Sequence, residues 1–107
     1  VFIDCNGAVI DLQEGQGIWL YADEDYQSSL DIQHCSIVNG LYYGLSYGGI
    51  STGNIYNCNF HSTNFGLKLF DESSVYNKFN FYQPTINGNW HLYRNSKHYC
   101  RLSPLLG

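Results

Sequence analysis

Short stretches in which apolar and polar residues alternate recur along the whole chain, and clusters of Gly, Asn, Ser, Thr and Asp separate them. One recurring unit reads apolar–x–polar–Cys–x–apolar, and it appears at residues 32–37 and again at residues 55–60. Less regular copies begin at Phe2 and Val75. A period of two residues, with many Ile, Val, Leu, Phe and Tyr, indicates short β-strands. No segment has apolar residues at helical spacing, so we expect little helix.

A second unit reads Gly–apolar–x–apolar and alternates with the first. It begins at Gly17, Gly44 and Gly66, and a copy without glycine begins at Asn89. Both units recur at intervals of roughly 20 to 30 residues, which is the repeat length of a parallel β-solenoid whose repeats each form one coil. The sequence therefore predicts an all-β solenoid of about four coils.

The coils are expected to occupy residues 1–98. Residues 99–107 match neither unit, and we expect them to form a terminal tail or cap.

Stacked coils place equivalent residues in columns about 4.8 Å apart. The first apolar residue of each copy of the first unit is expected to face the interior: Phe2, Ile32, Ile55 and Val75. The polar residue two positions later is expected at a sharp bend: Asp4, His34, Asn57 and Asn77. Asp, Asn and His are the non-glycine residues that best tolerate left-handed backbone, so they suit such a bend.

Three cysteines form a further column of small buried residues, at Cys5, Cys35 and Cys58. Neighbours in such a column lie within disulfide range, but a column of three cannot pair completely. The sequence favours free thiols.

Residues 4–7 (Asp-Cys-Asn-Gly), residues 54–60 and the three glycine-led units are similar to repeats of the right-handed parallel β-helix family. This family includes pectate-lyase-like enzymes, phage tailspikes, alginate epimerases and surface proteins of bacteria and archaea. The resemblance covers roughly residues 1–98, which is nearly the whole chain, and implies a right-handed parallel β-helix. The likeness to tailspikes implies trimeric packing. Because one fold hosts many activities, the function has to be argued from a site.

Composition narrows the function. The chain has 107 residues, charged residues make up 13%, and the formal net charge is −4, which argues against a nucleic-acid-binding protein. No apolar run approaches the roughly 20 residues of a membrane span. The sequence contains no Met, so we expect a processed product or part of a longer protein.

Four residues are candidates for catalysis. Alignment of the glycines places Asp23 and Glu72 in one column, two coils and about 9.6 Å apart, at the outer edge of the separation of an inverting glycosidase pair. The same alignment places Asp71 beside Arg94. If the protein is an enzyme, these residues indicate a glycoside hydrolase or a polysaccharide lyase. The simpler interpretation, which we favour, is a set of solvated turn residues with a surface ion pair.

Residues 23–25 (Asp-Glu-Asp) offer carboxylate oxygens of the kind that Ca²⁺ prefers. The spacing of an EF-hand is absent, and a polar loop tip explains the same residues. We therefore predict no cofactor and no metal ligands, with Ca²⁺ as the alternative.

The aromatic residues give a better indication of function, because they make up 17% of the chain and ten of them are Tyr. Tyr56 and Tyr76 are expected to share one outward column, after Gln33. Tyr combines a flat apolar face with a polar tip, which suits sugar rings or a protein interface. An outward column of such rings would form a groove for an extended polymer, and Tyr56 and Tyr76 are therefore the predicted substrate-binding residues.

The leading hypothesis is a solenoid module of a secreted, cell-surface or virion-borne protein that recognises polysaccharide, with cleavage left open. The alternative is a purely structural spacer, adhesin stalk or filament subunit without a ligand site. A third hypothesis is a lyase or epimerase that acts on uronic-acid polymers, although the negative net charge would repel such substrates unless a cation or Arg94 screened them. Because open coils expose strand edges, we also expect stacking on further coils or homo-oligomerisation into a trimer or filament.

Overall fold

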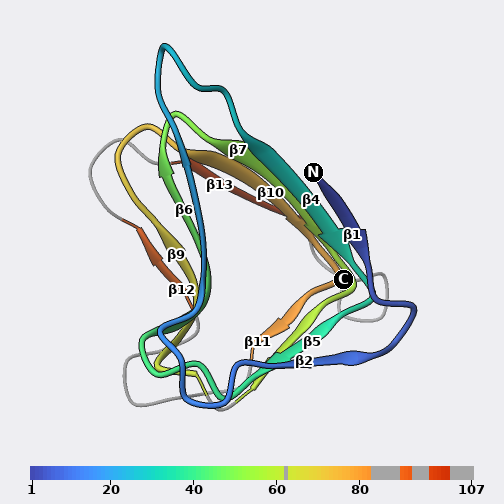
Figure 1. The fold of residues 1–107 in the computed structure, drawn as a ribbon. Helices are drawn as coiled ribbons and strands as arrows, with labels where there is room; N and C mark the ends of the chain where they lie inside the picture. The colour runs from blue at the N-terminus through green and yellow to red at the C-terminus, as the bar shows by residue number, and fades with distance from the viewer. Residues whose placement is uncertain (62, 83–89, 93–96, 102–107) are drawn as a thin grey trace.

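The computed structural model describes residues 1–61, 63–82, 90–92 and 97–101. Thirteen short strands and no helix occur in these residues, and the strands wind into a parallel β-solenoid (Figure 1). The predicted all-β solenoid is confirmed. The structure completes about three coils rather than the expected four, because parts of the last turn lie outside the described residues.

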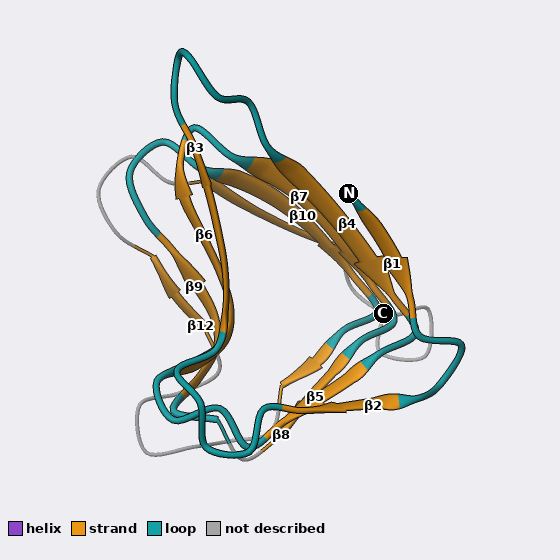
Figure 2. Ribbon diagram, in the orientation of Figure 1, coloured by secondary structure: helices purple, strands orange, loops and turns teal. Residues whose placement is uncertain are grey.

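Three parallel sheets form the sides of a triangular cross-section (Figure 2). Sheet A contains β1 (Phe2–Asp4), β4 (Ser29–Gln33), β7 (Thr52–Tyr56), β10 (Ser74–Lys78) and β13 (Lys97–Arg101). Sheet B contains β2 (Val9–Asp11), β5 (Ser36–Val38), β8 (Asn59–His61) and β11 (Phe81–Tyr82). Sheet C contains β3 (Ile18–Ala22), β6 (Tyr43–Gly49), β9 (Phe65–Leu69) and β12 (Trp90–Leu92).

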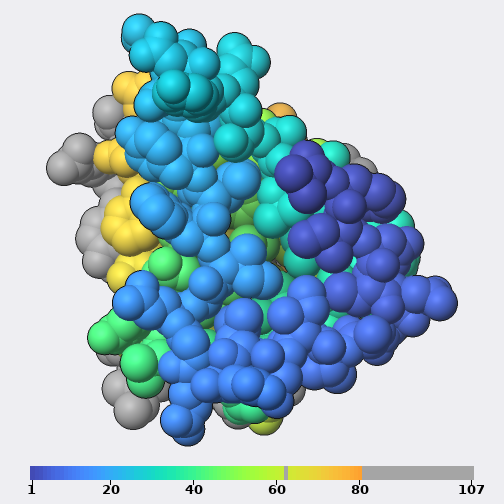
Figure 3. All heavy atoms as spheres, viewed as in Figure 1, coloured from blue at the N-terminus to red at the C-terminus, as the bar shows by residue number. Residues whose placement is uncertain are grey.

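Each coil takes one strand from each sheet, so β1–β3 form the first coil, β4–β6 the second and β7–β9 the third. Figure 3 views the molecule from the N-terminal end, where the first coil covers the later ones. From this end the chain runs clockwise as it recedes (Figure 1), so the solenoid is right-handed, as the family resemblance implied.

The glycine-led unit predicted sheet C correctly. Ile18 pairs with Leu45, Leu45 with Leu67, and Leu67 with Trp90. The expected tail was residues 99–107. Residues 99–101 belong to β13, which pairs with β10. Residues 102–107 lie outside the described residues.

The predicted aliphatic column in sheet A is wrong at both ends. Ile32 pairs with Ile55 as expected, but Ile3 rather than Phe2 pairs with Ile32, and Phe2 is 63% exposed. Val75 is buried, yet it lies in register with Gly53, two residues before Ile55. The sequence unit misassigned these positions because the first and last copies are displaced relative to the middle two.

The same displacement affects the bend after sheet A. His34 and Asn57 have left-handed backbone, with φ of 54° and 51°, as predicted. Asp4 and Asn77 lie within strands instead. Asn6 and Phe79 take the left-handed positions in those coils, with φ of 51° and 58°.

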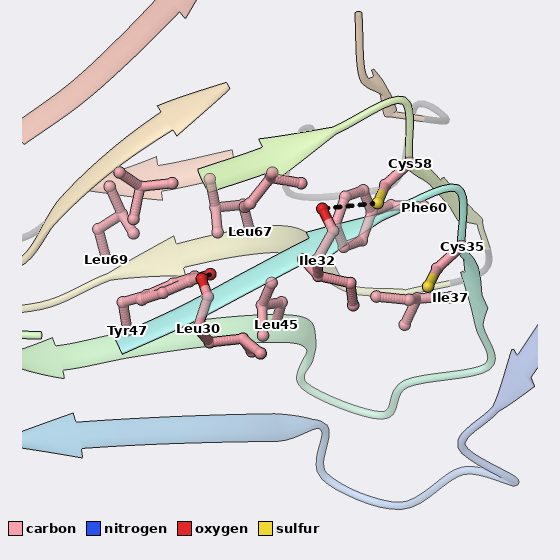
Figure 4. Close-up of a cluster of buried hydrophobic side chains, with 12 residues drawn as sticks. Leu30, Ile32, Cys35, Ile37, Leu45, Tyr47, Cys58, Phe60, Leu67 and Leu69 are labelled. Atoms are coloured by element: carbon pink, nitrogen blue, oxygen red, sulfur yellow. Dashed lines mark hydrogen bonds between the residues drawn. The ribbon is translucent and has the colours of Figure 1, made fainter. Parts of the chain in front are cut away.

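The core runs along the solenoid axis, and Figure 4 shows its apolar side chains in the middle coils. Its largest member, Tyr47, is fully buried and donates a hydrogen bond from its hydroxyl to Leu30 O at 2.8 Å. Burial raises the pKa of Tyr47 above its ordinary value. The ring fits because Gly53 leaves room, since a Cβ at that position would come within 2.6 Å of the ring and 2.1 Å of Leu30 O.

The cysteine column exists, but the prediction of free thiols is wrong for two of its members. Cys5 and Cys35 form a disulfide that joins the first coil to the second. Cys58 is free and buried, as expected, and its Sγ donates to Ile32 O at 3.6 Å (Figure 4). Burial raises the pKa of the Cys58 thiol. Pairing of the first two members leaves the third without a partner in the column.

Candidate functional site

The loop between β3 and β4 projects from the corner where sheet C meets sheet A (Figures 1 and 2). A surface depression of about 510 Å³ lies on the sheet C side of this loop. Two apolar or aromatic residues and four carboxylates contribute to its lining: Tyr21, Ile50, Asp23, Glu24, Asp71 and Glu72. This depression is therefore where the predicted carboxylates come together.

The glycine alignment that grouped these carboxylates agrees with the backbone of the corner. Hydrogen bonds from Ile50 N to Ala22 O and from Glu72 N to Gly49 O continue the coil-to-coil ladder beyond sheet C. Asp23 and Glu72 consequently lie around one depression, with Ile50 between them. Arg94, the fourth predicted catalytic residue, lies outside the described residues.

Two of the three carboxylates that were predicted to be catalytic accept hydrogen bonds from backbone N–H groups at the corner. Asp23 Oδ1 accepts hydrogen bonds from Asp25 N at 2.9 Å and from Tyr26 N at 2.8 Å. Asp71 has left-handed backbone, with φ of 55°, and accepts a hydrogen bond from Gly49 N at 3.2 Å. Glu72 is exposed to solvent. A carboxyl group that acts as a general acid is ordinarily shielded from water, so this arrangement suits the binding of hydroxyl groups better than acid catalysis.

An aromatic pair adjoins the depression on the outer face of β3. Trp19 is 63% exposed and Tyr21 is 49% exposed, and their ring centroids lie 6.0 Å apart. Both rings lean over Gly48 of the next coil, where a Cβ would lie 3.4 Å from Trp19 Nε1 and 3.5 Å from Tyr21 Cδ2. The two rings therefore lie close to the backbone of sheet C at Gly48.

Sequence reasoning missed this pair, which we call the Trp19–Tyr21 platform. The signal was present, because alternation with the inward-facing Ile18 and Leu20 places Trp19 and Tyr21 on the outer face.

The outer face of sheet C continues from the platform toward later coils. Trp19 is in register with Ser46, and Ser46 with Lys68. The Lys68 ammonium lies over the rings of Phe65 and Phe70, 4.9 and 5.4 Å from their centroids. Ser46 is buried, and its hydroxyl has no hydrogen-bond partner. The aromatic rings of the platform and the Lys68 ammonium group thus share one face with the depression.

A second depression, of about 360 Å³, lies on the sheet A side of the β3–β4 loop. Its polar lining consists of Gln27, Ser28, Ser29 and Thr52. Ala22 and Ile50 line both depressions, so the two are contiguous across the corner. Tyr21 of the platform also lines the first depression, so the platform and the two depressions adjoin one another.

The prediction that Tyr56 and Tyr76 share a column is wrong. Both lie on the outer face of sheet A, but Tyr56 pairs with Lys78, and Tyr76 pairs with Asn54. Tyr56 also contacts the rings of His34 and Phe79, with centroids 5.4 and 5.8 Å away. Its ring is consequently less available for stacking than the rings of the platform.

No group of three or more His, Cys, Asp or Glu side chains is arranged to hold a metal ion within the part of the chain that the structure describes. The carboxylates of residues 23–25 therefore do not form such a group there. In the same residues no helix has the length and apolar character needed to cross a membrane.

Comparison with protein-family models, with curated proteins and with solved structures finds no match to this chain.

Proposed function

We propose that the chain is a solenoid module that binds a neutral polysaccharide along the Trp19–Tyr21 platform and the two corner depressions. The observation that supports this most is the position of two exposed, adjacent aromatic rings directly beside a depression lined by carboxylates. This combination provides both kinds of contact that a sugar chain needs.

The flat faces of Trp and Tyr pack against the C–H faces of pyranose rings, and the indole N–H and phenol O–H remain able to hydrogen-bond. Ionised carboxylates accept hydrogen bonds and donate none, so they match the hydroxyl groups of a sugar. Because Asp23, Glu24, Asp71 and Glu72 surround one depression, a uronic-acid polymer would be repelled from it. The proposed ligand is therefore uncharged.

We propose binding without cleavage. Asp23 and Asp71 are held by backbone hydrogen bonds, and Glu72 is exposed. These observations favour turn-forming and ligand-contacting roles over an acid–base pair, and they disfavour the hydrolase and lyase hypotheses.

We further propose an extracellular, cell-surface or virion location. The disulfide between Cys5 and Cys35 supports an oxidising compartment, because such bonds persist mainly outside the reducing cytosol. A polysaccharide-binding module would meet its ligand in the same environment.

Affinity electrophoresis through gels that contain a soluble β-glucan, a mannan or polygalacturonate tests the proposal. We expect the neutral polymers to retard the protein and polygalacturonate to leave its mobility unchanged. Trp19→Ala and Tyr21→Ala should each abolish most of the retardation. Tyr42→Ala is the matched control for Tyr21→Ala, because Tyr42 is equally exposed, at 49%, and lies outside the platform.

Three outcomes would contradict the proposal. Absence of retardation by every polymer would favour the purely structural module. Loss of retardation in Tyr76→Ala but not in Trp19→Ala would move the binding face to sheet A. Release of reducing ends or of unsaturated sugars during incubation would show cleavage.

A further inference from the structure

Charge is segregated along the solenoid axis. Residues 1–61 contain seven of the nine carboxylates and no Lys or Arg: Asp4, Asp11, Glu14, Asp23, Glu24, Asp25 and Asp31. All five basic residues follow them: Lys68, Lys78, Arg94, Lys97 and Arg101. Because consecutive coils stack along the axis, the early coils are acidic and the later strands are basic.

This segregation is displayed on the outer face of sheet A. Asp4 on β1 and Asp31 on β4 are exposed at one end of the sheet, and Lys78 on β10 is exposed toward the other. The next strand, β13, continues the register with Lys97 and Arg101. The strand order β1-β4-β7-β10-β13 places β7 in the centre (Figure 1).

The same face exposes large aromatic side chains. Phe2 is 63% exposed, Tyr76 is 57% exposed, and Tyr56 on the central strand is 36% exposed. Exposed aromatic residues among polar ones are typical of the surfaces through which proteins associate.

We propose that the outer face of sheet A is the contact surface for a second copy of this chain, in a two-fold dimer whose axis runs parallel to β7. Rotation about that axis reverses the order of the coils and keeps the strand direction. It places β4 opposite β10 of the second copy and β1 opposite β13, so the strands that contain Asp4 and Asp31 face strands whose sequences contain Lys78, Lys97 and Arg101.

Two facing copies of sheet A could also be related by a different two-fold axis, but the charges disfavour that arrangement. Rotation about an axis parallel to the solenoid axis would place β1 opposite β1 and β4 opposite β4 of the second copy. The acidic strands would then face each other, and like charges across an interface oppose association. A closed two-fold contact also limits association to a dimer, whereas end-to-end stacking would extend without limit.

The outward column of sheet A that lies nearest to sheet B gives the residue pairs expected across the dimer. It contains Asp4, Gln33, Tyr56 and Lys78, one residue on each successive strand. In the dimer Gln33 lies opposite the partner's Lys78, and Tyr56 lies on the axis, opposite the partner's Tyr56. Five short strands make a small interface, so we expect a weak dimer that dissociates further as salt rises.

Sedimentation velocity over a range of protein concentrations tests the dimer at low and high ionic strength. We expect a monomer–dimer equilibrium that shifts toward monomer in high salt. Lys78→Glu should weaken the dimer about tenfold or more, because it places a carboxylate among the partner's acidic strands. Gln33→Lys should weaken it similarly by facing the partner's Lys78.

The double variant Gln33→Lys/Lys78→Glu should recover the dimer, since it restores opposite charges across the axis. This recovery would also show that the two substitutions together leave the fold intact. Lys68→Glu is the matched control, because it makes the same charge change on sheet C, and it should leave the dimer intact.

Three results would overturn the proposal: a monomer at every concentration, oligomers that grow beyond two copies, or failure of the double variant to recover association. Polysaccharide binding is assigned to sheet C and the corner, so the binding measurements and the sedimentation measurements fail independently.

Discussion

The first and second coils have closely similar inward patterns but differ in burial. In sheet C, Ile18 and Leu20 of the first coil are in register with Leu45 and Tyr47 of the second. Leu45 and Tyr47 are fully buried, whereas Ile18 and Leu20 are only partly buried. The second coil is covered on both sides, but in the described residues the first has a neighbour on one side only. Position in the stack, and not residue type, therefore decides how much each side chain contributes.

The first coil also differs from the second and third coils in what it contributes to the molecule. The second and third coils supply most of the buried core, while the first coil supplies the Trp19–Tyr21 platform and two of the carboxylates at the corner. The platform side chains lie on the outer face of β3, apart from the inward side chains of the same strand. The predictions below test this division, starting with the largest expected effect.

A matched pair of truncations in one column tests the comparison directly. We expect Leu45→Ala to lower the free energy of unfolding by about 2–5 kcal/mol, as for other fully buried leucines. Ile18→Ala should lower it by roughly half as much, because less apolar surface leaves water on folding. Urea denaturation monitored by circular dichroism provides both values. Equal losses would show that the two coils are equally packed.

Removal of the Cys5–Cys35 disulfide should loosen the first coil from the second. We expect the double variant Cys5→Ser/Cys35→Ser to lose about 2–4 kcal/mol of stability, because the crosslink restricts the unfolded chain. Thermal denaturation with and without reductant should show the same loss in the wild-type protein and no further loss in the variant. A melting temperature that does not respond to reductant would indicate that the bond is absent.

The left-handed bend after sheet A offers a finer test, because it is occupied by Asn57 in the third coil and by Phe79 in the next. Asn57→Ala should lower stability by about 1–2 kcal/mol, since alanine tolerates positive φ poorly. It also removes the 2.9 Å hydrogen bond between Asn57 Nδ2 and His34 Nδ1.

The reverse exchange, Phe79→Asn, replaces a bulky residue with one suited to this backbone. It should cost less than Asn57→Ala, even though it loses the contact with Tyr56. Chemical denaturation of both variants provides the comparison. A larger loss for Phe79→Asn would show that ring packing dominates at this bend.

The smallest expected effect is a loss of stability at acidic pH, which arises from two carboxylates in the first coil. A hydrogen bond from Gln33, together with one from the backbone of Asn6, lowers the pKa of Asp4 below its ordinary value of 3.8. Hydrogen bonds from the backbone of Gln13 and the side chain of Asn39 lower the pKa of Asp11 in the same way. A lowered pKa in the folded state means that the stabilisation is present above the unfolded value and is lost as pH falls through the folded value.

We therefore expect the melting temperature to fall below about pH 4. Asp4→Asn should make this fall shallower, because it removes one titrating group. Melting curves between neutral and strongly acidic pH measure the effect. The same slope in the variant and the wild type would contradict the assignment to Asp4.

Much of the fold could be predicted from the sequence, because period-two alternation and two repeated units reflect the physics of stacked strands. The register of sheet C followed from three glycines. The register at the two ends of sheet A did not, because the first coil has two additional residues between β1 and β2, and Val75 is displaced by two positions from Ile55. Spacing alone could not show these changes.

The candidate site was predicted in part. The glycine alignment brought Asp23 and Glu72 to one depression, because the coil-to-coil hydrogen bonds of sheet C continue into the first residues of the corner, before the longer loop of the first coil departs from the other turns. It could not show that Asp23 and Asp71 hold turn backbone, since that depends on side-chain geometry. The platform was overlooked although alternation with Ile18 and Leu20 places both rings on the outer face, because the strand pattern alone does not show how exposed the rings are.

Hydrogen exchange of the intact chain, followed by mass spectrometry, tests the central claim that position in the stack sets the contribution of each coil. The account predicts the slowest exchange in β6, β7 and β9, which are covered on both sides, and faster exchange in β1, β2 and β3. Exchange in β1–β3 that is as slow as in β6 and β7 would contradict it.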